Sequence, residues 1–180
     1  MRLRHGHGGI EAVNRRLLLA DRVEDILRAF GAQVADATVL HGPLVIHNAA
    51  GDYRNLRVGA NVHLGRLAVL DLAAPIELAA GCTVSMGTTI LTHSDVGEGP
   101  LAARHPRVVE PARIGEGSYL GANVTVLAGC QIGREAVVGA GTGRVTTARW
   151  SAACRRDRST RPAQTARVRS RRRTLASASR

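Results

Sequence analysis

The sequence contains no lysine and very few aromatic side chains. Of its 180 residues, one is Phe, two are Tyr and one is Trp. So few rings argue against the core of an ordinary β-sandwich or β-barrel. They also leave too few stacking surfaces for a protein that reads single-stranded nucleic acid. We therefore expect an interior packed regularly through small and aliphatic side chains.

Cysteine is also scarce, and long apolar runs are absent. The three cysteines, Cys82, Cys130 and Cys154, are an odd number without a C-x-x-C pair, which predicts reduced thiols rather than a disulfide framework or a zinc ribbon. No signal-peptide-like run and no stretch of about 18 apolar residues occurs. We expect a soluble, cytoplasmic protein.

The positive charge is unevenly distributed along the chain. Twelve of the 25 arginines lie between Arg144 and Arg180 beside a single acid, Asp157, whereas residues 1–142 hold 13 arginines against 13 Asp and Glu. The formal net charge of +11 therefore comes from the segment 143–180. Because the chain up to Thr142 is neutral, the high overall charge does not by itself indicate a nucleic-acid-binding domain.

Residues 1–33 show the apolar spacing of helices. Asp21 and Glu24 form a plausible capping box, and Gly31 is a helix stop. The sequence predicts a short N-terminal helical segment that packs on the end or side of the following domain. The apolar positions are Ile10, Val13, Leu17, Leu18, Ile26, Leu27 and Phe30.

From residue 34 the apolar period changes to six. Every sixth residue from Val34 to Thr88, and after a break from Val108 to Val138, gives 16 positions, of which 13 are Ile, Leu or Val. Chance predicts about four, since these types supply 43 of the 180 residues. Glycine often follows the aliphatic residue, as expected for a turn that needs a tight or positive-φ backbone. The pattern predicts an all-β solenoid with one short strand and one turn per unit over residues 34–142.

Three segments carry a resemblance to a known family: V-G-A-N-V-H at 58–63, I-G-E-G-S-Y-L-G-A-N-V-T-V-L-A-G-C-Q-I-G at 114–133, and V-V-G-A-G-T at 137–142. The chain resembles the hexapeptide-repeat acyltransferases, in particular the maltose and galactoside O-acetyltransferases, over about residues 45–142. The resemblance implies a left-handed parallel β-helix with three hexads per coil, a homotrimer with active sites between subunits, and acetyl-coenzyme A as the donor. We expect no metal.

The break in the period indicates where the chemistry lies. The step from Thr88 to Val108 is not a multiple of six, so residues of about 94–107 should leave the solenoid as a loop. His93 stands at the start of this loop, where the resemblance places a histidine general base. An imidazole suits the removal of a proton from an attacking hydroxyl.

Other site residues are expected on the acceptor and donor sides. The resemblance implies a substrate-side role for Asp71, and we place Ser94 and Asp95 there as well, while a solvated turn residue is the alternative for Asp71. The acceptor-binding Asn of the family is replaced here by the stretch 63–66. The donor contacts implied by the resemblance are Gly121, Ala122, Gly139 and Ala140; the alternative is that these are only turn residues. Cys82 and Cys130 fall on interior positions.

The segment 143–180 departs from the family pattern. Reading the codons of residues 143–158 one base out of frame permits T-R-D-D-G-A-V-V-G-G-V-P-A-R, which resembles the missing C-terminal motif of the family. We interpret 143–180 as a frameshifted, disordered tail. The alternative is a genuine basic arm that binds nucleic acid. In the frameshift interpretation this chain has weak or no activity, because its donor site lacks the final coil.

The sequence therefore predicts an acetyl-coenzyme A-dependent O-acetyltransferase that acts on a hydroxyl of a sugar or related small acceptor. Two alternatives stay open. One is a non-catalytic β-helix remnant. The other is a metalloenzyme resembling the γ-class carbonic anhydrases, which is disfavoured because His93 and His105 are twelve positions apart instead of five.

Overall fold

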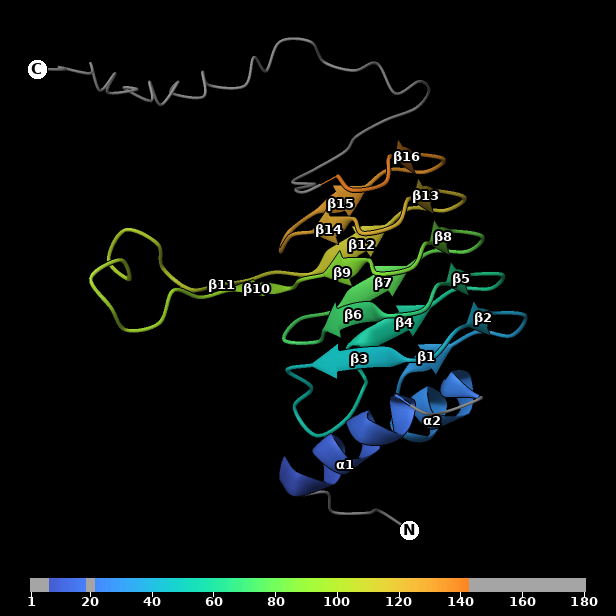
Figure 1. Cartoon of the computed structure of the whole chain (residues 1–180), viewed down its shortest axis with the longest axis horizontal. Helices are drawn as coiled ribbons and strands as arrows, with labels where there is room; N and C mark the ends of the chain where they lie inside the picture. Colours follow the sequence, from blue (N-terminus) through green and yellow to red (C-terminus); the bar gives the residue numbers. More distant parts are fainter. Residues whose placement is uncertain (1–6, 19–21, 143–180) are drawn as a thin grey trace, which may run out of the picture.

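The computed structural model describes residues 7–18 and 22–142. The first part of the chain forms two helices, α1 (His7–Leu17) and α2 (Val23–Ala29). They cover one end of a stack of short strands, where α1 contacts β3 and α2 contacts β1 (Figure 1). The expected N-terminal helical segment is confirmed, whereas the expectations for residues 143–180 and Cys154 lie outside the described residues.

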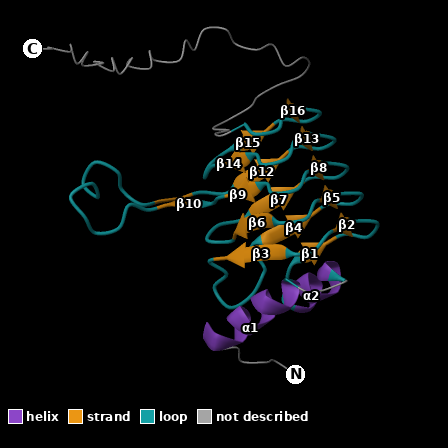
Figure 2. Ribbon diagram, in the orientation of Figure 1, coloured by secondary structure: helices purple, strands orange, loops and turns teal. Residues whose placement is uncertain are grey.

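The strands form three parallel sheets that are the faces of a triangular prism (Figure 2). Face A contains β1 (Gln33–Val34), β4 (Leu56–Val58), β7 (Ile76–Leu78), β12 (Ala112–Ile114) and β15 (Gln131–Ile132). Face B contains β2 (Val39–Leu40), β5 (His63–Leu64), β8 (Thr83–Val84), β13 (Tyr119–Leu120) and β16 (Val137–Val138). Face C contains β3 (Leu44–His47), β6 (Ala68–Asp71), β9 (Thr89–Ile90) and β14 (Thr125–Val126).

Each coil passes through faces A, B and C in turn, so the prism has three edges. We call them edge AB (residues 35–38, 59–62, 79–82, 115–118 and 133–136), edge BC (residues 41–43, 65–67, 85–88, 121–124 and 139–142) and edge CA (residues 48–55, 72–75, 91–111 and 127–130). The sequence step between paired residues on face A differs from coil to coil, as in Val34↔Val58, Val58↔Leu78, Leu78↔Ile114 and Ile114↔Ile132. Only the last of these steps spans the regular three hexads.

All of the extra residues enter at edge CA. In the last coil four positions separate the inward residue Val126 of face C from Cys130, which begins face A. In the earlier coils the corresponding steps are longer: Ile46 to Leu56, Leu70 to Ile76 and Ile90 to Ala112. The longest holds a projecting arm, in which β10 (His93–Ser94) pairs antiparallel with β11 (Val108–Val109) (Figure 1).

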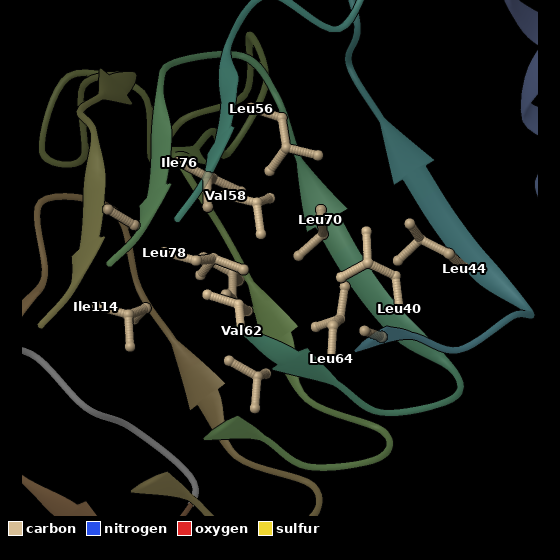
Figure 3. Close-up of a cluster of buried hydrophobic side chains, with 14 of the residues drawn as sticks. Leu40, Leu44, Leu56, Val58, Val62, Leu64, Leu70, Ile76, Leu78 and Ile114 are labelled. Atoms are coloured by element: carbon tan, nitrogen blue, oxygen red, sulfur yellow. The ribbon is translucent and has the colours of Figure 1, made fainter. Parts of the chain in front are cut away.

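Aliphatic side chains fill the interior of the prism (Figure 3). From β3 onward, two inward positions in each strand region of the three faces are buried, such as Leu56 with Val58 and Val62 with Leu64. The aromatic residues Phe30 and Tyr53 meet where the helices join the prism, with ring centroids 6.0 Å apart, and Tyr119 is exposed. The interior of the coils is thus lined by aliphatic and small side chains, as the composition predicts.

The simple six-residue frame is wrong at three places, the first being Asp52, which lies partly exposed among the extra residues of edge CA. The two extra residues after Leu70 shift the frame, so Ile76, Cys82 and Thr88 occupy the first inward position, and the column of Leu70 continues with Ile90. Val108 is exposed on the projecting arm, and the interior column resumes at Ala112 and Ile114. Reading every sixth residue still gave mostly buried residues after Leu70, because the first and the second inward position of a strand region are both mostly apolar.

The glycines that follow the aliphatic residues are explained by close stacking of the coils. A Cβ on Gly115 would lie 2.4 Å from the carbonyl carbon of Gly133, and a Cβ on Gly121 would lie 2.5 Å from the backbone nitrogen of Ala140. Their φ angles are not in the left-handed region, which occurs two positions later in the turn, as at Gly117 and Asn123. The requirement at these glycines is therefore for space between coils, so of the two expected reasons the tight backbone is found and the positive φ is not.

Candidate active site

Edge CA gathers polar side chains from three successive coils. Asn48 follows β3, Asp71 ends β6, and Thr92 and His93 follow β9. Because the coils stack in parallel, with His47 opposite Asp71 on face C, side chains up to 45 positions apart in the sequence become neighbours. The sequence-predicted residues His93 and Asp71 are thus brought together.

The Asp71 carboxylate is fully buried and fully hydrogen-bonded. Its Oδ2 accepts from the backbone N–H of Thr92 and of His93, both at 2.9 Å, and lies 2.5 Å from Nδ1 of His93. Its Oδ1 accepts from Nδ2 of Asn48 at 2.8 Å and from the backbone N–H of Ala73 at 3.4 Å. A buried charge is tolerated only with such partners, so this carboxylate is held in one orientation.

The pKa of Asp71 reflects two opposing effects. Burial alone would raise the pKa of the carboxyl, because it disfavours the charged form. The hydrogen bonds from His93, Asn48 and Thr92, together with the charge of the imidazolium, outweigh burial and lower the pKa from 3.8 to about 2. Asp71 is therefore a carboxylate at neutral pH.

His93 connects the buried carboxylate to solvent. Its Nδ1 faces Asp71, and its side chain is 25% exposed whereas that of Asp71 is fully covered. With the Nδ1 proton donated to Asp71, Nε2 has its lone pair free to accept a proton. This arrangement of carboxylate, imidazole and open surface is that of a general base.

The substrate-side role predicted for Asp71 does not fit this geometry. The side chain has no exposed surface, and both of its oxygens are occupied by groups of the protein. Asp71 is instead placed to orient and stabilise His93. The alternative of a solvated turn residue is excluded by the same burial.

Ser94 and Asp95 lie on the projecting arm next to His93. Ser94 is exposed and pairs with Val108 across the arm. The carboxylate of Asp95 accepts from the backbone N–H of Gly97 at 2.7 Å and lies 3.6 Å from Arg107, so it contributes to the conformation of the loop. Contact of either side chain with an acceptor stays a prediction.

The four predicted donor contacts lie on edge BC, across face C from His93. Gly121 is buried, and its lack of a side chain is already required by the stacking of Ala140. Ala122 is partly exposed, and Gly139 and Ala140 are exposed. The coenzyme-contact role of these residues stays a prediction.

Sequence reasoning missed Asn48 and Thr92. Asn48 has φ of 52°, and besides binding Asp71 its Nδ2 lies 3.2 Å from Nδ1 of His93. The Thr92 hydroxyl lies 2.5 Å from the backbone oxygen of Asp71 and accepts from the N–H of Ala74 at 3.0 Å. A first coil of four hexads, counted back from Asp71, would have led to residues 47–48. The simple six-residue frame does not show that this coil is longer than the regular one, so Asn48 was not recognised.

Other sequence expectations can be compared with the described residues. Cys82 and Cys130 are buried as expected, and burial raises the pKa of the Cys82 thiol to about 11. Within residues 7–18 and 22–142, no group of three or more His, Cys, Asp or Glu side chains is placed to hold a metal ion. Neither described helix has the length and apolar character that crossing a membrane requires.

Two family models match the sequence. The one described as bacterial transferase hexapeptide, with six repeats, matches residues 111–143, and the one described as the hexapeptide repeat of succinyl-transferase matches residues 55–92. A search of curated proteins finds no match.

Solved structures share the fold. A hexapeptide-repeat-containing acetyltransferase from Vibrio cholerae O1 biovar eltor, complexed with acetyl coenzyme A, is 16% identical with a TM-score of 0.65, and the match covers 76% of this chain and 74% of that one. A maltose O-acetyltransferase from Clostridium difficile 630 is 20% identical with a TM-score of 0.64, covering 76% and 73%. The predicted fold class and resemblance are confirmed: the chain carries hexapeptide repeats at 55–92 and 111–143, and it has the left-handed parallel β-helix fold that these acetyltransferases share.

Proposed function

We propose that the protein is an acetyl-coenzyme A-dependent O-acetyltransferase that acts on a hydroxyl of a sugar or related small acceptor. The observation that carries the proposal is the buried Asp71 carboxylate 2.5 Å from Nδ1 of a partly exposed His93. The fold shared with an acetyltransferase solved with acetyl coenzyme A and with a maltose O-acetyltransferase supports the choice of donor and acceptor.

In the proposed reaction, Nε2 of His93 accepts the proton of the acceptor hydroxyl while the hydroxyl oxygen attacks the thioester carbonyl carbon. The tetrahedral intermediate collapses by breaking the carbon–sulfur bond, and the imidazolium returns the proton to the departing thiolate. Asp71 stabilises the imidazolium and holds the ring in the required tautomer. A backbone N–H of a coil turn would stabilise the oxyanion.

A homotrimer is part of the proposal, because one chain separates the two halves of the site. His93 lies on edge CA and the proposed donor contacts lie on edge BC, so a whole prism face of about five residues, roughly 15 Å, lies between them. A neighbouring copy that presents its edge BC to His93 would complete the site. Sedimentation should then give three copies per particle, and an active monomer would contradict this arrangement.

The outer surfaces of the faces support the same assembly. Face A presents polar and charged side chains, including Arg57, Glu77 and Arg113, in one column. The corresponding column of face B is apolar toward its two ends, where Val39, Tyr119 and Val137 are 48%, 46% and 63% exposed, and polar between them, at His63 and Thr83. The exposed apolar side chains toward the two ends of this column are suited to burial against another copy.

The end of the repeat bears on the activity of this chain. A further regular coil of three hexads would place residue 144 in the column of Val126 and residue 150 in that of Ile132, where the sequence has Arg144 and Trp150. This supports the frameshift interpretation, so we expect this chain to be weakly active or inactive and a frame-restored chain to be active.

Thiol release from acetyl-coenzyme A, measured with a panel of sugar acceptors, tests the proposal. We expect acceptor-dependent release by the frame-restored chain and a loss of about a thousandfold or more in His93→Ala. His105→Ala, in the projecting loop, is the matched control and should retain activity. Unchanged turnover in His93→Ala would refute the general base, and no release with any acceptor would favour the non-catalytic remnant.

A further inference from the structure

A shallow groove of about 380 Å³ runs along edge BC where it borders face B. It crosses the first three coils of the prism and is apart from the Asp71–His93 pair. The side chains that line it are His41, His63, Arg66, Thr83, Ser85 and Met86. They supply three basic groups and two hydroxyls, and no carboxylate.

The charge of Arg66 distinguishes this groove from the groove on face A that Arg113 and Arg134 line. There, Arg113 lies 3.5 Å from Glu77 and Arg134 lies 3.1 Å from Glu116, so the arginines that line the groove are neutralised by carboxylates in the same groove. Arg66 forms no ion pair with any residue in the described part of the chain. Its five N–H donors are therefore available to a ligand.

The two imidazoles beside Arg66 are also available. The rings of His41 and His63 come from adjacent coils and meet edge to face with their centroids 5.0 Å apart. Neither ring has a hydrogen-bond partner among residues 7–18 and 22–142. The rigid pairing of β2 with β5 fixes their spacing, so little conformational freedom is lost when a ligand binds.

From these features we propose that the groove is a binding site for an anionic group, either a carboxylate or a phosphate, held by Arg66 with His41 and His63. Guanidinium binds both anions in a bidentate fashion, and the hydroxyls of Thr83 and Ser85 can donate to the remaining oxygens. A cation is disfavoured there by the unpaired charge of Arg66.

The role of this site rests on the proposed function. In the proposed trimer, edge BC of one copy faces His93 of the next, so the anion would belong to a molecule in the shared site. The site would therefore favour acceptors that carry a carboxylate or phosphate besides the reactive hydroxyl, such as uronic acids or sugar phosphates. The second source of the same chemistry is a phosphate of the coenzyme.

Direct binding is tested first, without turnover. Inorganic phosphate is titrated into the full chain labelled in histidine and arginine, and the NMR signals of the His41 and His63 rings and of Arg66 are followed. Site-resolved signals are needed because the arginines beyond Arg144 also attract phosphate. We expect Arg66→Gln to weaken binding at the histidines at least tenfold. Arg57→Gln removes the same charge from face A and should leave phosphate binding at the two histidines unchanged. Equal behaviour of the two variants, or no shift in the wild type, would overturn the site.

The source of the anion is then identified on the frame-restored chain. If the acceptor supplies it, Arg66→Gln lowers kcat/KM at least tenfold for a uronic acid and leaves the matching neutral sugar unchanged. If the coenzyme supplies it, Arg66→Gln raises KM for acetyl-coenzyme A and spares its 3′-dephospho form. Equal effects on all of these substrates would overturn the anion role. Failure of all turnover would count against the proposed function, and the phosphate titration would still decide the site.

Discussion

Edge AB and edge CA of the same prism are built in opposite ways. At edge AB each turn has the same length, and small residues such as Gly59 and Gly115 let the backbone of the next coil approach to a distance that excludes a Cβ. At edge CA the coils carry extra residues, the spacing differs from coil to coil, and the side chains that meet are Asn48, Asp71, Thr92 and His93.

The difference shows where a repeat protein can hold a reactive site. A regular edge uses its backbone hydrogen bonds to join coils, as from Gly115 to Ile132, and its buried polar side chain Ser118 donates to the carbonyl of Gly115 in its own turn. The extra residues of edge CA leave backbone donors at Thr92, His93 and Ala73 that bind Asp71 instead. The buried carboxylate of Asp71 is satisfied where the repeat is interrupted.

After the loss of His93 itself, replacing the carboxylate at edge CA gives the largest expected effect. Asp71→Asn should lower the turnover of the frame-restored chain about a hundredfold or more, because the amide can no longer stabilise an imidazolium. Stability should fall as well. Since the folded-state pKa lies below 3.8, the carboxylate stabilises the fold above about pH 4, on the order of 2 kcal/mol, and this contribution is lost as the pH falls toward 2.

Urea unfolding of the wild type and of Asp71→Asn between pH 2 and pH 7 measures this contribution. The variant should lack the part of the acid dependence that Asp71 contributes. Asp52→Asn is the control, because the pKa of Asp52 is also lowered, by Arg54, but its side chain is partly exposed and lies outside the site. If Asp71→Asn kept full activity and the same pH dependence of unfolding, the carboxylate at edge CA would contribute no more than one in a solvated turn.

A large side chain at the regular edge should affect stability. In Gly115→Val the new Cβ would lie 2.4 Å from the carbonyl of Gly133, which must move, and we expect a loss of about 3 kcal/mol. Gly99→Val is the control, since no atom lies within 4 Å of a Cβ there. Thermal unfolding of both variants checks this, and equal midpoints would show that the coils at edge AB can separate without cost.

The regular part of the fold could be predicted from sequence because the physical requirement repeats. Each coil buries two residues per face, so an apolar period of six survives even where two extra residues shift the frame after Leu70. The interrupted edge carries no period. The loop after His93 could be predicted only because the repeat fails there. Val108 was predicted to be an inward residue but is exposed, so the apolar pattern did not indicate where the chain rejoins the prism.

The site was predicted only where its residues adjoin an interruption. His93 stands directly before the long loop, and Asp71 stands before the two extra residues of its coil. The direction of Asp71 into the protein depends on the N–H groups of Thr92 and His93, which sequence does not reveal. Asn48 lies two coils from His93, and its position depends on insertions whose lengths differ.

The missed residue Asn48 gives a smaller expected effect. Asn48→Ala removes the donor to Oδ1 of Asp71, so turnover should fall about tenfold and Asp71 should accept a proton at a higher pH. Asn61→Ala is the matched control, since Asn61 also has a positive φ, of 56°, but turns at edge AB. Acid unfolding and thiol release distinguish the two. A loss of activity that is equal in both variants would assign the effect to backbone strain.

The smallest effect concerns the turns themselves. Four stacked positions on edge BC have left-handed backbone: Leu67 at φ 60°, Gly87 at 69°, Asn123 at 56° and Gly141 at 68°. Leu67 is 53% exposed and is the member of this column least suited to that conformation. Leu67→Asn should therefore stabilise the fold by about 0.5–1 kcal/mol. Leu67→Ala removes the same exposed surface but keeps the strain, so its unfolding midpoint in urea should stay near that of the wild type. A gain as large in Leu67→Ala would mean that the exposed leucine, rather than its backbone, opposes the regular turn.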